Sequence, residues 1–228
     1  FTEPVLLSVY IGLGVLGWQI LYNRLPVDLL LYISLGFALP LLGLMLFQPP
    51  LYHNFRQALF LIPAMVMLAA FTLELVFSKL PQTWARVLVI VAIAWPGIYS
   101  SIKLYPYEYV YYNSLVGGIA GATDRYELDY WRTSLHEMAI DLNELAPEGA
   151  KIIISGSAGL FNRYARPDLV VDTVTSNRYD VNGGYDYAVQ IARWQKWDLY
   201  PDAKNVVLIE RDGAVLATVK AVKNASMK

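Results

Sequence analysis

Long apolar runs separated by short polar turns fill the first hundred residues, and shorter apolar segments follow them. A helix rises about 1.5 Å per residue, so about 20 apolar residues cross the hydrocarbon core of a bilayer. Four consecutive near-uncharged runs of about this size predict membrane helices rather than buried helices of a soluble protein. The four predicted spans are residues 5–22, 29–47, 58–77 and 87–102, and Pro40, Pro63 and Pro96 are expected to kink three of them.

The pattern after residue 128 predicts a small α/β domain. Apolar residues recur every three or four positions from Trp131 to Leu145, which predicts an amphipathic helix with Asp129 as its N-cap. Short apolar runs predict five strands, and the last two flank an Asp-Gly turn typical of a hairpin. The predicted strands are residues 151–155, 169–174, 187–191, 206–210 and 215–222.

Charge follows the same division of the chain. Apolar residues make up 56% of the sequence and charged residues 16%, and only eight of the 37 charged side chains lie in residues 1–104. Neither part carries the basic patch of a nucleic-acid-binding protein. The chain has no cysteine and only two histidines, His53 and His136, which excludes a disulfide framework and disfavours a histidine metal site.

The short loops predict the orientation of the spans. Arg24, Lys79 and Arg86 fall on one side, against Arg56 and Lys103 on the other, and the more basic side is the cytoplasmic one. We therefore expect a multi-pass protein of the cell membrane with its C-terminal domain outside the cytoplasm. The start at Phe1, without a signal-peptide pattern, predicts a fragment of a longer protein.

Tyrosines crowd residues 105–112, directly after the last predicted span. Their rings suit the headgroup layer of a bilayer, which is the favoured explanation, and a platform on which a sugar ring stacks is the alternative. Glycines at 117, 118 and 121 then mark a turn. The sequence thus predicts three parts: membrane helices over 1–104, an interfacial linker over 105–128, and an extracytoplasmic α/β domain over 129–228.

Two groups of polar residues are candidates for chemistry. Arg56, with Tyr52 and His53 close by, ends an outer loop, where its guanidinium would bind a phosphate or snorkel to the interface. The carboxylates of the outer part are Glu108, Asp124, Glu127 and Asp129. Glu127 and Asp129 could serve as a general base or as metal ligands, although charges at a helix start explain them more simply.

The segment 51–63, in which a loop arginine leads into a proline-containing span, resembles family 39 glycosyltransferases, the dolichyl-phosphate-mannose protein mannosyltransferase-like group of the GT-C class. Gln57 stands where these enzymes frequently have histidine. The segment 105–113, Gly117-Gly118 and the segment 126–131 resemble the part that follows the membrane helices in prokaryotic members.

This resemblance implies an enzyme that transfers a sugar from a polyprenyl-phosphate donor to a glycan, lipid or protein acceptor outside the cytoplasm. The family's catalytic acid residue lies in an earlier external loop, so this chain would hold no catalytic residue. Arg56 matches the loop arginine and is the candidate contact of the lipid phosphate, with His53 and Tyr52 beside it. Candidates on the acceptor or sugar side are Tyr107, Glu108, Glu127, Asp129 and Trp131.

A divalent metal ion, whose use varies across such enzymes, is the one cofactor that the resemblance brings into consideration, and no metal ligand is assigned. The alternative function is a membrane-anchored module that binds a glycan or a partner without catalysis.

Overall fold

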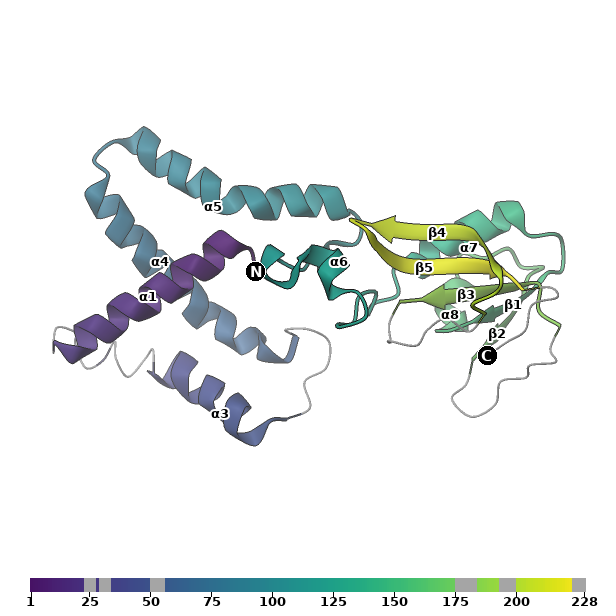
Figure 1. The fold of residues 1–228 in the computed structure, drawn as a ribbon, viewed down its shortest axis with the longest axis horizontal. Coiled ribbons are helices and arrows are strands. Elements are labelled where there is room, and N and C mark those ends of the chain that lie inside the picture. The colour runs from purple at the N-terminus through teal and green to yellow at the C-terminus, as the bar shows by residue number, and fades with distance from the viewer. Residues whose placement is uncertain (23–27, 29–33, 50–55, 175–183, 193–199, 223–228) are drawn as a thin grey trace. The chain divides into compact units, whose positions relative to one another are not determined.

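The computed structural model describes residues 1–22, 28, 34–49, 56–174, 184–192 and 200–222. The chain forms two units, Phe1–Lys103 and Leu104–Lys228 (Figure 1). The first contains only helices among its described residues, and the second contains a five-stranded sheet with helices. This agrees with the predicted order of apolar helices followed by a small α/β domain.

Three helices of the first unit are long and apolar enough to cross a membrane: α1 (Glu3–Leu21), residues 57–79 with α4 (Ile62–Lys79), and α5 (Thr83–Leu104). They correspond to the first, third and fourth predicted spans. The second predicted span includes residues outside the described part. Its described part forms a π-helical turn (Ser34–Ala38) and α3 (Leu39–Phe47), a shorter apolar helix. The lengths and composition of these helices indicate membrane association.

Helices α1 and α4 pack closely because small residues line their contact. A Cβ atom added to Gly12 would lie 2.5 Å from the carbonyl oxygen of Leu68, which requires a glycine there. The Thr72 hydroxyl donates a hydrogen bond of 2.6 Å to the Ser8 carbonyl across the contact. Close backbone approach at small residues and interhelical hydrogen bonds are the usual means by which helices associate in lipid.

The three prolines predicted to kink helices have different positions. Pro40 and Pro63 lie at the second residues of α3 and α4, where a π-helical segment (Ser34–Ala38) and a 3₁₀ segment, respectively, pass into the α-helix, so each proline marks a change of helix type. Pro63 follows a 3₁₀ helix, Arg56–Leu61, so the third predicted span begins as a 3₁₀ segment and continues as an α-helix. Pro96 lies in the interior of α5.

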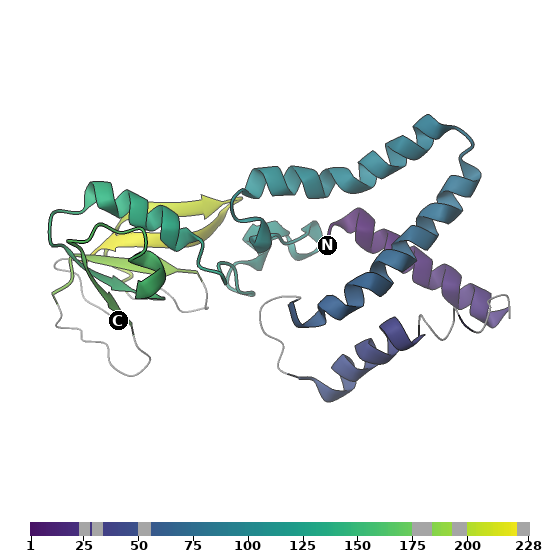
Figure 2. The ribbon, with the colours of Figure 1, turned by 180° about the vertical axis from the view of Figure 1, so that it is seen from behind.

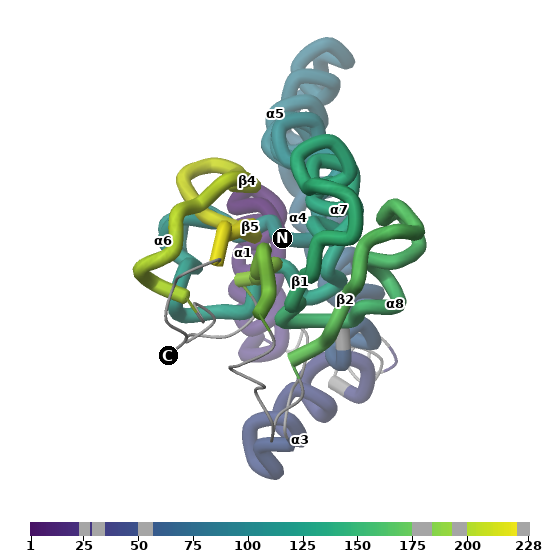
Figure 3. The backbone as a smooth tube through the Cα atoms, turned by 90° about the vertical axis from the view of Figure 1, so that its right-hand side faces the viewer, coloured from purple at the N-terminus to yellow at the C-terminus, as the bar shows by residue number. Residues whose placement is uncertain are grey.

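The sheet of the second unit has the strand order β2-β1-β3-β5-β4. Strands β2, β1 and β3 are parallel, and β5 and β4 continue the sheet antiparallel. Figure 3 views the unit from one end, with β4 and β5 on one side and β1 and β2 on the other. The strands are β1 (Lys151–Ile154), β2 (Val170–Thr173), β3 (Tyr187–Ile191), β4 (Lys204–Arg211) and β5 (Ala214–Ala221).

Two helices, α7 (Ser134–Leu145) and α8 (Ala158–Phe161), cover one face of the sheet (Figure 2). The main core lies beneath them, where Leu135, Met138 and Leu142 of α7 meet Ile152 and Val189 of the sheet. A second, smaller cluster on the opposite face contains Ile153, Ala188, Tyr200 and Val222.

The segment between α5 and α7 belongs to the second unit. It contains two 3₁₀ turns (Glu108–Val110 and Ser114–Val116) and the short helix α6 (Gly118–Ala122). Leu104, Tyr107, Val110 and Ile119 are buried in the main core. The stretch set apart as a linker from its sequence is therefore part of the folded domain, while its predicted contact with lipid headgroups stays a prediction.

The sequence placed the strands well and the start of α7 poorly. All five strands lie within two residues of their predicted bounds, and Asp212 and Gly213 form the hairpin turn with positive φ angles. The prediction of Asp129 as N-cap is wrong: α7 begins at Ser134 with Thr133 as its N-cap. The left-handed φ of 58° at Arg132 interrupts the backbone between Asp129 and the helix.

Candidate functional site

The candidate phosphate-binding loop lies at the start of the third predicted span. Tyr52 and His53 fall outside the described residues. Arg56 is the first residue of the 3₁₀ helix Arg56–Leu61 that continues into α4. The backbone thus brings Arg56 to the end of an apolar helix, the position at which the sequence places a contact with a lipid phosphate.

Asp129 is completely buried and holds together the turn that precedes α7. Its carboxylate accepts hydrogen bonds from the backbone N–H groups of Thr133, at 3.0 Å, and Ser134, at 3.4 Å. It also accepts hydrogen bonds from the hydroxyls of Ser134 and Tyr109. A buried carboxylate surrounded by donors in this way stabilises the helix start and the neighbouring segment.

The other acidic and aromatic candidates of this segment do not gather around Asp129. Glu127 is half-buried, and its backbone carbonyl accepts a 3.0 Å hydrogen bond from the Tyr112 hydroxyl. Glu108 is exposed, and the Trp131 ring is 56% exposed and lies edge-on against the Tyr130 ring. The two carboxylates that the sequence places two residues apart therefore differ in environment, and Asp129 has a structural role.

Tyr107, a candidate sugar contact, lies in the core rather than on a stacking platform. Its hydroxyl donates a 2.6 Å hydrogen bond to the Glu137 carboxylate of α7. Arg211, at the end of β4, lies 3.3 Å from the same carboxylate, and its guanidinium carbon lies 4.8 Å from the centre of the Tyr107 ring. This cluster joins the segment after α5 to both α7 and the terminal hairpin.

Burial dominates the protonation equilibria of these tyrosines. It raises the pKa of Tyr112 to about 12, with a smaller contribution from Glu127. Burial also raises the pKa of Tyr107, where the hydrogen bond to Glu137 adds to the effect, and that of Tyr109, where the negative charge of Asp129 does. All three phenols stay neutral at physiological pH and act as hydrogen-bond donors.

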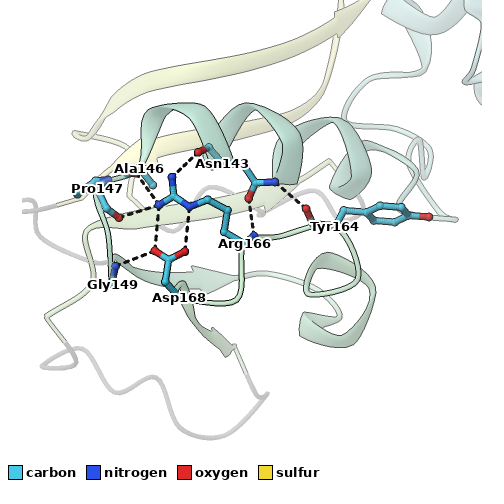
Figure 4. A network of polar contacts seen from close by, with 7 residues as sticks. All are labelled: Asn143, Ala146, Pro147, Gly149, Tyr164, Arg166 and Asp168. Atoms are coloured by element: carbon cyan, nitrogen blue, oxygen red, sulfur yellow. Dashed lines mark hydrogen bonds and ion pairs between the residues drawn. The ribbon is translucent and has the colours of Figure 1, made fainter.

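A third network connects the C-terminal end of α7 to the segment that leads into β2 (Figure 4). The Arg166 guanidinium donates hydrogen bonds to the carbonyls of Asn143, in the last turn of α7, of Ala146, its C-cap, and of Pro147 just beyond. The last carbonyls of a helix have no intrahelical partner, so Arg166 supplies one. It also pairs with Asp168 at 3.1 Å. The hydrogen bond from Arg166, together with one from the Gly149 N–H, lowers the pKa of Asp168.

Sequence reasoning missed the partners that give these residues their roles. Glu137 and Arg211 are 74 residues apart, and neither belongs to a recognisable motif. Arg211 precedes the predicted Asp-Gly turn, so the hairpin indicated its backbone conformation but not its contact with α7. Tyr109 was visible only as one member of a tyrosine-rich stretch.

Within the part of the chain that the structure describes, no group of three or more His, Cys, Asp or Glu side chains is arranged to hold a metal ion. Two of the described candidates, Asp129 and Tyr107, are instead the centres of two structural clusters. Comparisons of this chain with protein families, with curated protein sequences and with solved structures find no match.

Proposed function

We propose that this chain is the C-terminal portion of an integral-membrane glycosyltransferase that uses a polyprenyl-phosphate sugar donor. The observation that carries the proposal is the position of Arg56, at the start of an apolar helix long enough to cross a membrane. A cation at the end of such a helix is favoured where it meets an anion at the lipid surface. The resemblance of residues 51–63 and 105–131 to family 39 glycosyltransferases supports the same conclusion.

In this proposal Arg56 compensates the charge of the phosphate that leaves with the lipid when the sugar is transferred. The general base that activates the acceptor hydroxyl lies outside this chain. A general base must reach the acceptor hydroxyl. Asp129 is buried and accepts hydrogen bonds from Ser134 and Tyr109, which supports a base outside this chain rather than Asp129. The α/β domain would lie outside the cytoplasm, on the side where the donor sugar is presented.

The test is sugar transfer by the full-length protein in membranes that contain the polyprenyl-phosphate sugar. Arg56→Ala should lower kcat about 10²-fold, the size of effect expected for one lost contact to a developing anion, and Arg56→Lys should retain part of the activity. Arg86→Ala is the matched control, because the guanidinium of Arg86, in the first turn of α5, donates a hydrogen bond to the carbonyl of Leu80, the C-cap of α4. Equal turnover by the Arg56→Ala and Arg86→Ala proteins would refute the role of Arg56.

The second candidate is a membrane-anchored module that binds a glycan or a partner. Asp129 and Tyr107 favour this second function, because their hydrogen bonds within the domain give both candidate residues a structural role rather than a catalytic one. The same membranes discriminate the two functions. A module would show no turnover with any polyprenyl-phosphate sugar and would retain glycan binding when Arg56 is replaced.

A further inference from the structure

The longest uncharged stretch that follows α5 is residues 109–123, between Glu108 and Asp124. It includes the 3₁₀ turn Ser114–Val116 and the short helix α6. We call residues 113–122, which contain three glycines, the glycine turn. Turns that water covers are usually rich in polar residues, whereas this turn has mostly apolar side chains between its glycines.

Leu115 is the exposed tip of the glycine turn. It is 75% exposed, the largest fraction for any large apolar side chain among the described residues of the second unit. Ile119 and Ala122 of the same turn are buried in the main core. A single exposed leucine is ordinary on a protein surface. Here, however, no charged residue lies within six positions of Leu115 along the chain, so the exposed part of the turn is apolar as well.

The backbone of the glycine turn forms hydrogen bonds within the turn. The N–H groups of Val116 and Gly118 both donate to the Asn113 carbonyl, at 3.2 and 3.0 Å, and the Gly121 N–H donates to the Gly117 carbonyl at 3.1 Å. Gly117 has a φ of 91°, and a Cβ atom at Gly121 would collide with the Val116 carbonyl oxygen, so this closed form requires glycine at both positions. Backbone polar groups that lipid covers must be satisfied within the protein. The glycine turn therefore suits apolar surroundings better than an open loop would.

The glycine turn belongs to the folded unit that begins where a membrane helix ends. Helix α5, one of the three helices long and apolar enough to cross a membrane, ends at Leu104. Leu104 and Ile119 are members of the same hydrophobic core. Tyr105, the residue after α5, is 73% exposed, and tyrosine at the end of a membrane helix is typical of the lipid–water interface.

We propose that the glycine turn contacts the lipid bilayer, with the Leu115 side chain among the upper acyl chains and Tyr105 at the headgroups. Lipid fits this surface better than the other occupants. A glycan requires polar side chains that bind its hydroxyls, and a protein interface of standard size uses about 20–30 residues on each side, more than this turn offers. The proposal depends on the membrane association of α5 and is independent of sugar transfer and of Arg56.

The structure thus moves the lipid contact away from the middle of the tyrosine-rich stretch. Tyr107 is buried in the core, and Tyr111 and Tyr112 are half-buried against it. The turn marked by glycines in the sequence takes their place at the membrane surface.

The test uses the absence of cysteine from the chain. Leu115→Cys provides a single site for a nitroxide spin label on the full chain in lipid nanodiscs. Electron paramagnetic resonance then measures how often the nitroxide collides with oxygen, which concentrates in lipid, and with a nickel chelate, which stays in water. Ile102→Cys, at a position 73% exposed in α5, is the lipid reference, and Leu145→Cys, at a position 54% exposed at the end of α7, is the water reference.

The ratio of oxygen to nickel collisions at position 115 should be several-fold higher than at position 145 and approach the ratio at position 102. A ratio equal to that at position 145 would place Leu115 in water and overturn the proposal. Low collision rates with both reagents would also overturn it, because they would show that a protein partner or a second copy of the chain covers the turn. Since Leu115 is exposed, its replacement should leave the fold of the second unit intact.

Discussion

Replacement of Asp129 by alanine should destabilise the α/β domain strongly. The substitution removes the acceptor of four hydrogen bonds, two from backbone N–H groups of Thr133 and Ser134 and two from the Tyr109 and Ser134 hydroxyls. A hydrogen bond to a charged group contributes about 1.5–3 kcal/mol, and a donor left buried without a partner carries a further penalty. These contributions are not additive, so we expect a loss of about 4 kcal/mol.

The measurement is thermal unfolding of the purified chain, followed by tryptophan fluorescence. In a domain of this size a loss of about 4 kcal/mol lowers the Tm by roughly 15 °C. Asp129→Asn keeps one oxygen acceptor and should lose less, and Tyr109→Phe removes a single donor and should lose least. Replacement of a carboxylate whose role is catalytic would instead lower activity and leave the unfolding temperature unchanged. An Asp129→Ala protein that unfolds at the wild-type temperature would therefore refute the structural role.

Three further predictions concern other parts of the chain. Gly12→Ala should destabilise the α1–α4 contact, because its Cβ would lie 2.5 Å from the Leu68 carbonyl oxygen. Gly14→Ala, in open space on the same helix, is the control and should leave the unfolding temperature in detergent unchanged or raise it. Arg166→Met should lower the unfolding free energy by about 1–2 kcal/mol in urea titrations, since it removes the donors to three carbonyls at and just past the C-terminal end of α7. The pKa of Tyr112 is about 12 in the folded chain against about 10 in the unfolded chain, so its contribution to stability is complete below pH 10 and is lost as the pH rises through 12. Unfolding at alkaline pH should therefore coincide with the appearance of phenolate absorbance. The midpoint of this alkaline transition should shift in Tyr112→Phe.

Periodicity predicted most of the α/β domain because local patterns determine its strands. Each strand is a short apolar run between polar segments, and the Asp212-Gly213 turn accepts the positive φ angles that a tight hairpin requires. The stripe Leu135, Met138 and Leu142 likewise identified the buried face of α7. Trp131 and Leu145, counted in the same stripe, are exposed because one precedes the helix and the other ends it.

The roles of the candidate residues depended on contacts that no local pattern contains. A tyrosine-rich stretch after a span is typical of a membrane interface, yet Tyr107 is buried by Glu137 and Arg211, which come from distant parts of the chain. Periodicity likewise predicted a strand over residues 215–222, and only the folded chain shows that its polar residues Thr218 and Lys220 are buried.

Buried polar groups therefore divide into two kinds in this domain. Asp129 lies among donors that the chain itself supplies, and its hydrogen bond from Tyr109 links elements that are separate in sequence. Such groups specify the fold, and their replacement acts on stability. Thr218 lies among elements already joined by strand pairing, and its hydroxyl adds nothing to that pairing. A group of this second kind does not specify the fold.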